Sequence, residues 1–268
     1  MVLKDQVRHL ETDKTFDGKV VDDQSFTHHI FTRLTALKVR FVRVDFRYTT
    51  FDACYLRKCT FDSCDFTGAR FVNTNLHGSG FTGCKFGYVT FEKTIVDSDI
   101  LDMCCPPFEN LKARFARTLR MNYQSLGDAS SANKAILVEL EATEVHLHKA
   151  WQSNESYYRQ KYQHRARAFV SWSWFTVLDF VWGNGERPWK LVRTVALLLL
   201  LMGVGDALFF RDAGLMSSYW EAFLDAPQIF MGAKETKYPG LLTAAVIFTR
   251  LIVFGLFLSI LIRRLAQR

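Results

Sequence analysis

A bulky apolar residue recurs at every fifth position through residues 26–101 of the chain. The segment FDSCDFTGARFVNTNLHGSGFTGCKF, residues 61–86, shows this spacing clearly, with Phe61, Phe66, Phe71, Leu76 and Phe81 in register. An α-helix repeats every 3.6 residues and a β-strand every two, so neither explains a period of five. The first part of the chain therefore requires a repeat architecture of another kind.

Sorting the bulky positions with a period of 20 places similar residues together. The columns are Phe26, Phe46, Phe66 and Phe86; Phe31, Phe51, Phe71 and Phe91; Ala36, Leu56, Leu76 and Val96; Phe41, Phe61, Phe81 and Leu101. A random Phe-rich sequence would not sort in this way. Internal periodicity of this kind indicates repeats that stack along one axis.

Over residues 22–105 this pattern resembles the pentapeptide-repeat family, in which each five-residue unit forms one side of a square coil. The resemblance implies a right-handed quadrilateral β-helix, with the bulky residue and the small residue two before it pointing inward. The small inward positions include Cys54, Cys59, Cys64, Ala69 and Cys84. Four coils at a strand spacing of about 4.8 Å predict a rod about 20 Å long. We assign residues 1–107 to this domain, with MVLKDQVRHLETD as an N-terminal cap and Pro106-Pro107 as its end.

Three cysteines, Cys64, Cys84 and Cys104, are spaced by 20 and should stack on one side of the coil. We interpret them as buried core residues, because free cysteine is commonly buried and no histidine shares their column. We expect no metal site and no cofactor. The sequence also contains no nucleophile–base pattern and no phosphate-binding loop, so we expect no catalytic residue and no enzyme.

The charge of the rod argues against mimicry of DNA, which is known in gyrase-binding members of the family that resemble an acidic rod. Residues 1–105 hold 14 basic and 14 acidic side chains, so the whole net charge of +7 lies in residues 106–268. The basic run Lys38, Arg40, Arg43 and Arg47 is typical of a solvated surface. We expect no nucleic-acid partner, and we retain a cytoplasmic protein as the partner that a repeat domain of this kind would bind.

Residues 108–189 have helical character and form a predicted cytoplasmic connector. A first helix ends near Gly127, and either Asp128 or Ser130 can cap the helix that follows. Residues 166–182 are rich in tryptophan, which prefers the headgroup layer, and predict a helix on the membrane surface. The breaker residues Gly183, Gly185 and Pro188 then precede an apolar segment.

Two apolar segments follow, LVRTVALLLLLMGVGDALFF (191–210) and GLLTAAVIFTRLIVFGLFLSILI (240–262). Each is long enough to cross a bilayer core of about 30 Å as a helix. Basic residues precede the first and follow the second, while residues 211–239 carry three basic and four acidic side chains. The positive-inside rule therefore predicts a multi-pass protein of the cell inner membrane, with the lipid bilayer as its partner and both termini cytoplasmic.

Residues 190–268 resemble a two-helix transmembrane domain of the potassium-channel pore type, and WGNGERPWKLVR resembles the turn that joins such a domain to pentapeptide repeats in bacterial proteins. The order is span, short amphipathic helix from residue 218 to 226, tight loop and second span. The resemblance implies a homotetramer in which residues 218–235 re-enter the membrane from outside. Gly203, Gly205 and Gly255 are expected to be close-packing positions between helices.

The predicted filter departs from the family pattern. Its positions are Phe230, Met231, Gly232, Ala233, Lys234 and Glu235, where the family has a T-V-G-Y-G-like run. Stacked carbonyls of that run strip water from potassium. We therefore expect a weakly selective pore, or a channel relic that no longer conducts.

Two charges lie within the predicted spans, Asp206 and Arg250. Their Cα atoms differ in depth by about 6 Å at 1.5 Å per residue, so an intramembrane ion pair is one interpretation. The other places Arg250 on the pore wall, where it would repel cations.

Three functions remain open at this point. The first is an oligomeric ion channel with the rod as its cytoplasmic regulator. The second is a membrane-anchored pentapeptide-repeat scaffold. The third is an effector that depolarises the membrane when a partner triggers it.

Overall fold

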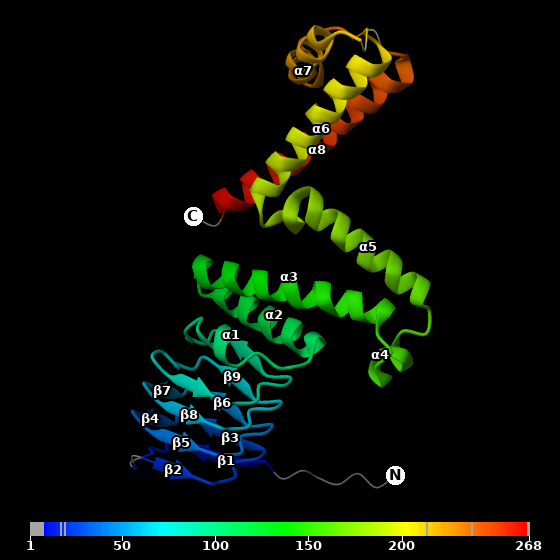
Figure 1. Ribbon diagram of the computed structural model, residues 1–268. Coiled ribbons are helices and arrows are strands. Elements are labelled where there is room, and N and C mark those ends of the chain that lie inside the picture. Colours follow the sequence, from blue (N-terminus) through cyan, green and yellow to red (C-terminus); the bar gives the residue numbers. More distant parts are fainter. Residues whose placement is uncertain (1–7, 17, 19, 213, 237, 267–268) are drawn as a thin grey trace. The chain divides into compact units, whose positions relative to one another are not determined.

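The computed structural model describes residues 8–16, 18, 20–212, 214–236 and 238–266. These divide into two compact units, Met1–Ala168 and Phe169–Arg268. Figure 1 shows short strands and then helices along the first unit, and helices alone in the second.

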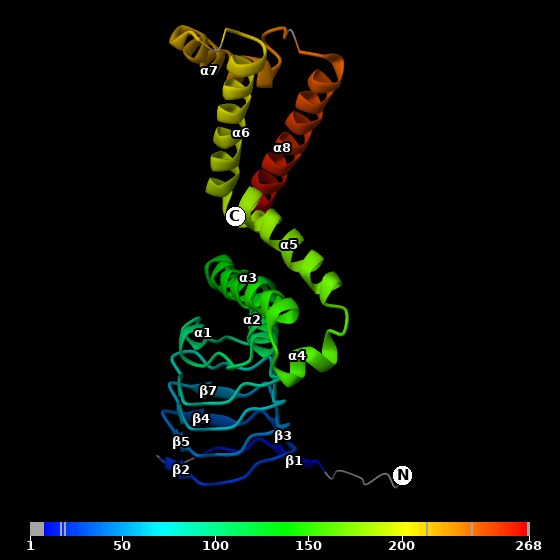
Figure 2. The same cartoon turned by 45° about the vertical axis from the view of Figure 1, so that its right-hand side comes forward.

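Within its described residues, the first unit begins with eleven short strands, all of which pair in parallel. Their orders are β1-β3-β6-β9-β11, β10-β8-β5-β2 and β4-β7, and isolated bridges such as Asp45↔Asp65 hold a further side. Partners lie 20 residues apart, as in Phe31↔Phe51 and Phe41↔Phe61. The predicted β-helix is therefore confirmed, and the register gives one coil for every 20 residues. Figures 1 and 2 show the coils stacked on one another. The strands are β1 His9–Thr12, β2 Val20–Asp22, β3 His29–Thr32, β4 Thr35–Leu37, β5 Arg40–Val42, β6 Thr50–Asp52, β7 Tyr55–Arg57, β8 Thr60–Asp62, β9 Arg70–Val72, β10 Gly80–Thr82 and β11 Thr90–Glu92.

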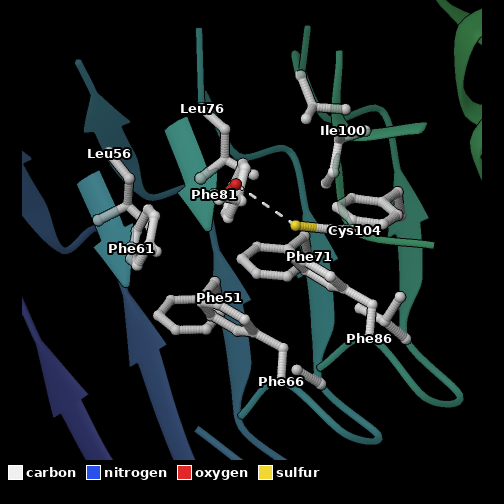
Figure 3. Packing of buried hydrophobic residues seen from close by; sticks show 14 of the residues in the cluster. Phe51, Leu56, Phe61, Phe66, Phe71, Leu76, Phe81, Phe86, Ile100 and Cys104 are labelled. Atoms are coloured by element: carbon white, nitrogen blue, oxygen red, sulfur yellow. Dashed lines mark hydrogen bonds between the residues drawn. The ribbon is translucent and has the colours of Figure 1, made fainter. Parts of the chain in front are cut away.

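Stacked phenylalanines fill the interior of the coil (Figure 3). The ring centroids of Phe51 and Phe71 lie 4.8 Å apart with planes 5° from parallel, and those of Phe66 and Phe86 lie 5.1 Å apart at 7°. Each ring therefore covers the ring of the same column on the next coil. Burial of this apolar surface is the main stabilising contribution that one coil makes to its neighbour.

The small inward residues form hydrogen bonds to carbonyl oxygens 23 residues earlier in the chain. The thiols of Cys54 and Cys104 donate to Phe31 and Phe81 at 3.3 and 3.5 Å, the second drawn in Figure 3. The hydroxyl of Thr74 donates to the carbonyl oxygen of Phe51 at 3.1 Å. Burial raises the pKa of Cys54 to about 11, so this thiol keeps the proton that it donates.

The repeat begins one coil earlier than the sequence analysis placed it. Strand β1 lies within the segment predicted to be an N-terminal cap, and it pairs with β3 in the register His9↔His29. Phe16 packs edge-on against Phe26 and Phe41, at centroid distances of 5.8 and 5.3 Å. Residues 1–7 of the predicted cap lie outside the described residues.

A helix covers the last coil. After the short α1 (Ile100–Met103), α2 (Glu109–Ser125) and α3 (Ala129–Gln152) pack together beyond β11 (Figure 1). Phe115 of α2 lies 5.5 Å from Phe86, centroid to centroid. The buried side chain of Asn122 accepts from Thr94 N at 2.8 Å and donates to Thr94 O at 2.7 Å. Helix α2 thus satisfies backbone groups that another coil would otherwise pair.

We expect Asn122→Ala to lower the free energy of unfolding by about 2–4 kcal/mol, because it leaves two buried backbone groups of Thr94 unpaired. Thermal unfolding of the full chain in detergent, followed by circular dichroism, measures the change. Asn110→Ala is the matched control, since the Asn110 amide bonds to Tyr157 on the exposed surface. An equal loss of stability in both variants would contradict this role of Asn122.

The predicted helices after the rod are present, with refined ends. Asp128, rather than Ser130, caps α3 by accepting from Ser131 N at 3.0 Å. Residues 166–182 are helical, as expected, and belong to α5. The position of this helix on a membrane surface stays a prediction. The remaining elements are α4 Ser156–Lys161, α5 Arg165–Trp182, the 3₁₀ turn η1 Gly183–Gly185, α6 Pro188–Phe209, α7 Met216–Met231 and α8 Gly240–Ala266.

Helices α6 and α8 are long and apolar enough to cross a membrane. In the most apolar stretch of each helix, only 22% of α6 and 6% of α8 is buried within the described chain. A core helix of a soluble domain would be mostly buried. By length and composition, both helices are therefore suited to span a membrane.

Candidate functional site

The second unit is a hairpin in which α7 joins α6 to α8. Figure 2 shows α6 and α8 diverging toward the end where α7 lies. Helix α7 packs closely on α6. A Cβ placed at Gly203 of α6 would lie only 3.3 Å from the Cα of Phe223 in α7. Gly203 is therefore a close-packing position, as expected. Gly205 and Gly255 are not close-packing positions within the single chain, since a Cβ at either would meet no atom of another element within 4 Å in the part of the chain that the structure describes.

The tight turn before α6 is built from the residues that the sequence analysis marked as breakers. Gly183 has a φ of +66°, and a Cβ there would lie 2.6 Å from the Cβ of Arg187. Lys190 forms an ion pair with Asp179, and the guanidinium of Arg193 lies 4.4 Å from the ring centroid of Phe180. These contacts tie the start of α6 to the end of α5.

Helix α7 is longer than the segment predicted from residue 218 to 226. It continues through Pro227 to Met231 and ends at Gly232, whose φ is +81°. Gly232 N donates to Ile229 O, and Ala233 N donates to Gln228 O at 2.8 Å. These bonds form a glycine-terminated C-cap that satisfies the last carbonyls of the helix.

Phe230 and Met231, two of the six predicted filter residues, are therefore helical. The expectation of irregular backbone at these two positions is wrong, because the residues before Gly232 extend the amphipathic helix up to the glycine that ends it. Phe230 is buried and Met231 is exposed. Gly232, Ala233, Lys234 and Glu235 follow the helix as exposed residues.

A charge cluster fixes α7 across the end of α6. The guanidinium of Arg211 contacts the carboxylates of Asp206 at 2.7 Å, Glu221 at 3.1 Å and Asp225 at 2.5 Å. Lys234 also contacts Asp225, at 2.6 Å. The side chains of Asp206 and Asp225 are largely buried, and charged hydrogen bonds of this kind are stronger where water is excluded.

The predicted ion pair between Asp206 and Arg250 is not formed. Asp206 pairs instead with Arg211, which lies five residues later, just beyond the end of α6. Sequence reasoning counted Arg211 only as a charge of the outer loop. The sequence did contain a signal for this ion pair, because the basic residue Arg211 follows directly after a helix whose last turn contains the acidic residue Asp206.

Arg250 lies at the C-terminal end of α7. A Cβ built on Gly232 would be 2.2 Å from Nη1 of Arg250, so the guanidinium occupies the space beside that glycine. The C-terminal end of a helix carries partial negative charge, which favours a cation there. Within the described residues Arg250 forms no ion pair with a carboxylate, so α7 provides its nearest electrostatic compensation.

An apolar groove of about 400 Å³ separates α6 from α8. Leu198, Leu201 and Met202 line it from α6, and Leu242 and Val246 line it from α8. Asp206, Tyr238 and Thr249 are among its polar residues. Within one chain, the two helices therefore leave apolar surface between them uncovered.

Comparison with known proteins identifies the rod. Residues 34–101 match the family model described as a pentapeptide repeat region. A comparison with curated proteins gives no match. Among solved structures, a pentapeptide repeat protein from the Arabidopsis thaliana thylakoid lumen aligns with a TM-score of 0.35 and 17% identity, covering 40% of this chain and 74% of that one. QnrB1, a plasmid-mediated fluoroquinolone resistance protein, aligns with a TM-score of 0.22 and 14% identity, covering 34% of this chain and 64% of its own. Residues 34–101 of this chain are therefore a pentapeptide-repeat region, folded as a β-helix.

Proposed function

We propose that the chain is an oligomeric ion channel of the cell inner membrane, with its pentapeptide-repeat rod as a cytoplasmic regulatory domain. The C-terminal hairpin assembles with copies of itself, as a tetramer, because one hairpin encloses no pathway. The observation that carries this proposal is the exposed apolar surface of α8. Only 6% of the most apolar stretch of this helix is buried within the described chain. Lipid covers one side of such a helix, and neighbouring copies cover the other.

The construction of α7 supports a pore over a simple anchor. An anchor needs only a short connection between its spans, whereas here a 16-residue helix packs on α6. Arg211 links it to Asp206 through the charge cluster. We place α7 in the outer part of the membrane, with both chain termini in the cytoplasm. This is the position of the short helix in the pore domains that residues 190–268 resemble.

The site does not support potassium selectivity. Phe230 and Met231 belong to helix α7, so their carbonyl groups point along the axis of that helix. Lys234 is held by Asp225, and Arg250 lies beside Gly232. A pore with these residues around its narrow part should favour anions or discriminate little between ions.

Purified full-length protein in planar bilayers tests the proposal. We expect discrete currents from preparations whose tetrameric state has been verified by native mass spectrometry. Dilution experiments should show that conducting units disappear as tetramers dissociate. Intact tetramers that carry no current would rule out conduction and leave the second candidate.

The second candidate is a membrane-anchored scaffold, and one observation favours it. The exposed faces of the rod present paired charges such as Arg43 with Asp22 and Arg70 with Glu92. Surfaces of this kind suit protein recognition. In that function the hairpin serves only to hold the rod at the membrane.

A further inference from the structure

Helix α4 is a short element that lies between α3 and α5 in the chain. A small apolar cluster packs it on α3, in which the buried Tyr158 meets Ala150 of α3 and Ala168 of α5, and Tyr162 is partly buried beside them. A helix of 6 residues is too short to be stable by itself in water. The position of α4 therefore depends on its few contacts with α3.

His146 of α3 lies between two phenols of this segment. Its Nδ1 is 3.3 Å from the hydroxyl oxygen of Tyr158, and its Nε2 is 2.9 Å from the hydroxyl oxygen of Tyr162. The three rings are also neighbours, since the phenol centroids lie 5.5 and 5.8 Å from that of the imidazole. Both nitrogens of one α3 side chain thus hold α4 and the residue that ends it.

This pair of hydrogen bonds suits a neutral imidazole. A neutral ring has one N–H donor and one acceptor nitrogen, so one phenol accepts a hydrogen bond from His146 and the other donates one to it. Burial raises the pKa of Tyr158 to about 12, so this phenol keeps its proton near neutral pH. A protonated ring has two donors and no acceptor, so one of the two phenols would lose the acceptor of its O–H.

The surroundings of His146 also disfavour a positive charge on the ring. Burial, and then the ammonium group of Lys161 on α4, lower the pKa of His146, and the carboxylate of Glu109 on α2 opposes them with a smaller effect. Glu109 is itself paired with Lys149 of α3 at 3.5 Å. From α5, the guanidinium of Arg165 donates to the two residues that directly follow α3.

A lowered pKa in the docked state makes the docking of α4 weaker in acid. With α4 undocked, an exposed histidine has a pKa of about 6.5, so below that pH the undocked state binds more protons than the docked state. Docking is therefore strongest above pH 6.5 or so, and is progressively lost as the pH falls from there towards the lower pKa of the docked state. Between pH 7.5 and 5.5 one such histidine can weaken docking by up to about tenfold.

We propose that His146 forms an acid-sensitive contact that holds α4 on α3 at neutral pH through Tyr158 and Tyr162, and that releases α4 when the ring is protonated. After release, residues 153–164 form a flexible connection between α3 and α5. The contact belongs to the first unit and adds a response to pH that the function proposed above does not require.

Hydrogen–deuterium exchange of the full chain in nanodiscs of zwitterionic lipid tests the proposal. Amide protection factors, corrected for the pH dependence of intrinsic exchange, are compared at pH 7.5 and 5.5. We expect protection of residues 157–163 to be about three- to tenfold lower at pH 5.5, while that of α2 stays the same. His146→Gln keeps a donor and an acceptor that do not titrate, so its protection should be equal at the two pH values. His164→Gln, which removes an exposed histidine beside the segment, should behave as the natural protein does.

Two results would overturn the proposal. One is equal protection of α4 at both pH values in the natural protein, and the other is the same loss in acid for His146→Gln as for the natural chain. If His146→Gln leaves α4 unprotected at both pH values, NMR titration of the His146 ring in the natural protein decides, with the signal assigned by its absence from that variant. A midpoint below about 6.5 supports the acid-sensitive contact, and a midpoint at or above this value contradicts it. None of these outcomes depends on whether the hairpin conducts.

Discussion

Replacing Phe66 with alanine is expected to lower the free energy of unfolding of the rod by about 3–5 kcal/mol, the usual cost of truncating a fully buried phenylalanine. Phe66 is 0% exposed and stacks on Phe46 and Phe86, each at a centroid distance of 5.1 Å. Its ring also meets Phe61 edge-on at 5.4 Å. The cavity cannot close easily, because the backbone ladders on either side fix the distance between coils.

Phe26→Ala is the matched control for this prediction. Phe26 belongs to the same column but is only partly buried, and it stacks on Phe46 at 5.6 Å near the start of the rod. We expect it to cost roughly half as much, about 1.5–2.5 kcal/mol. Calorimetric unfolding of the full chain in detergent measures both. Equal costs at the two positions would contradict the view that neighbouring coils on both sides stabilise each ring.

The rod should also unfold unevenly. In a stack of repeats each coil contacts only its neighbours, so the end with fewer contacts opens first. Helix α2 covers one end through Phe115 and Asn122. A variant that loses this cover and one that loses Phe66 should therefore weaken different parts of the same ladder.

The β-helix could be predicted because each five-residue unit of the sequence specifies its own position in the register. Each bulky inward residue repeats every five positions, and the columns sorted by 20 are the pairs that the strands form, such as Phe51↔Phe71. The first coil was not predicted, because Glu11 pairs with Phe31 at a position where the repeat otherwise has an apolar residue. Helix α2 was predicted as a helix, but its role as a cover depends on the Asn122–Thr94 contact, which spans 28 residues.

The candidate sites were less accessible to sequence reasoning. The partner of Asp206 depends on where α6 ends and on how α7 crosses it, whereas the depth of the Cα atoms along the spans favoured Arg250 of the opposite span. The end of α7 was misplaced because the resemblance to a filter outweighed the helical pattern up to Gly232.

If the hairpin conducts as proposed, replacing Arg250 with glutamine should raise the permeability of cations relative to anions at least about fivefold. Arg250 holds its guanidinium beside Gly232, at the C-terminal end of α7. Two unit charges about 4 Å apart repel each other by about 1 kcal/mol even at the dielectric constant of water, and by more where water is excluded. A difference of that size corresponds to about a fivefold change in an equilibrium, so reversal potentials in asymmetric salt would detect it.

Gly232→Ala should shift selectivity in the same direction without touching Arg250 itself. The new Cβ would lie 2.2 Å from Nη1, so the guanidinium must move away from the end of α7. Alanine at the φ of +81° found at Gly232 is also strained. The control is Gly255→Ala, which changes another glycine of the hairpin and whose Cβ would meet no described atom of another element within 4 Å. Arg250→Lys keeps the charge and should keep the selectivity. Currents in the natural protein with unchanged selectivity in both Arg250→Gln and Gly232→Ala would place Arg250 away from the ion path, as a residue that only compensates the helix end.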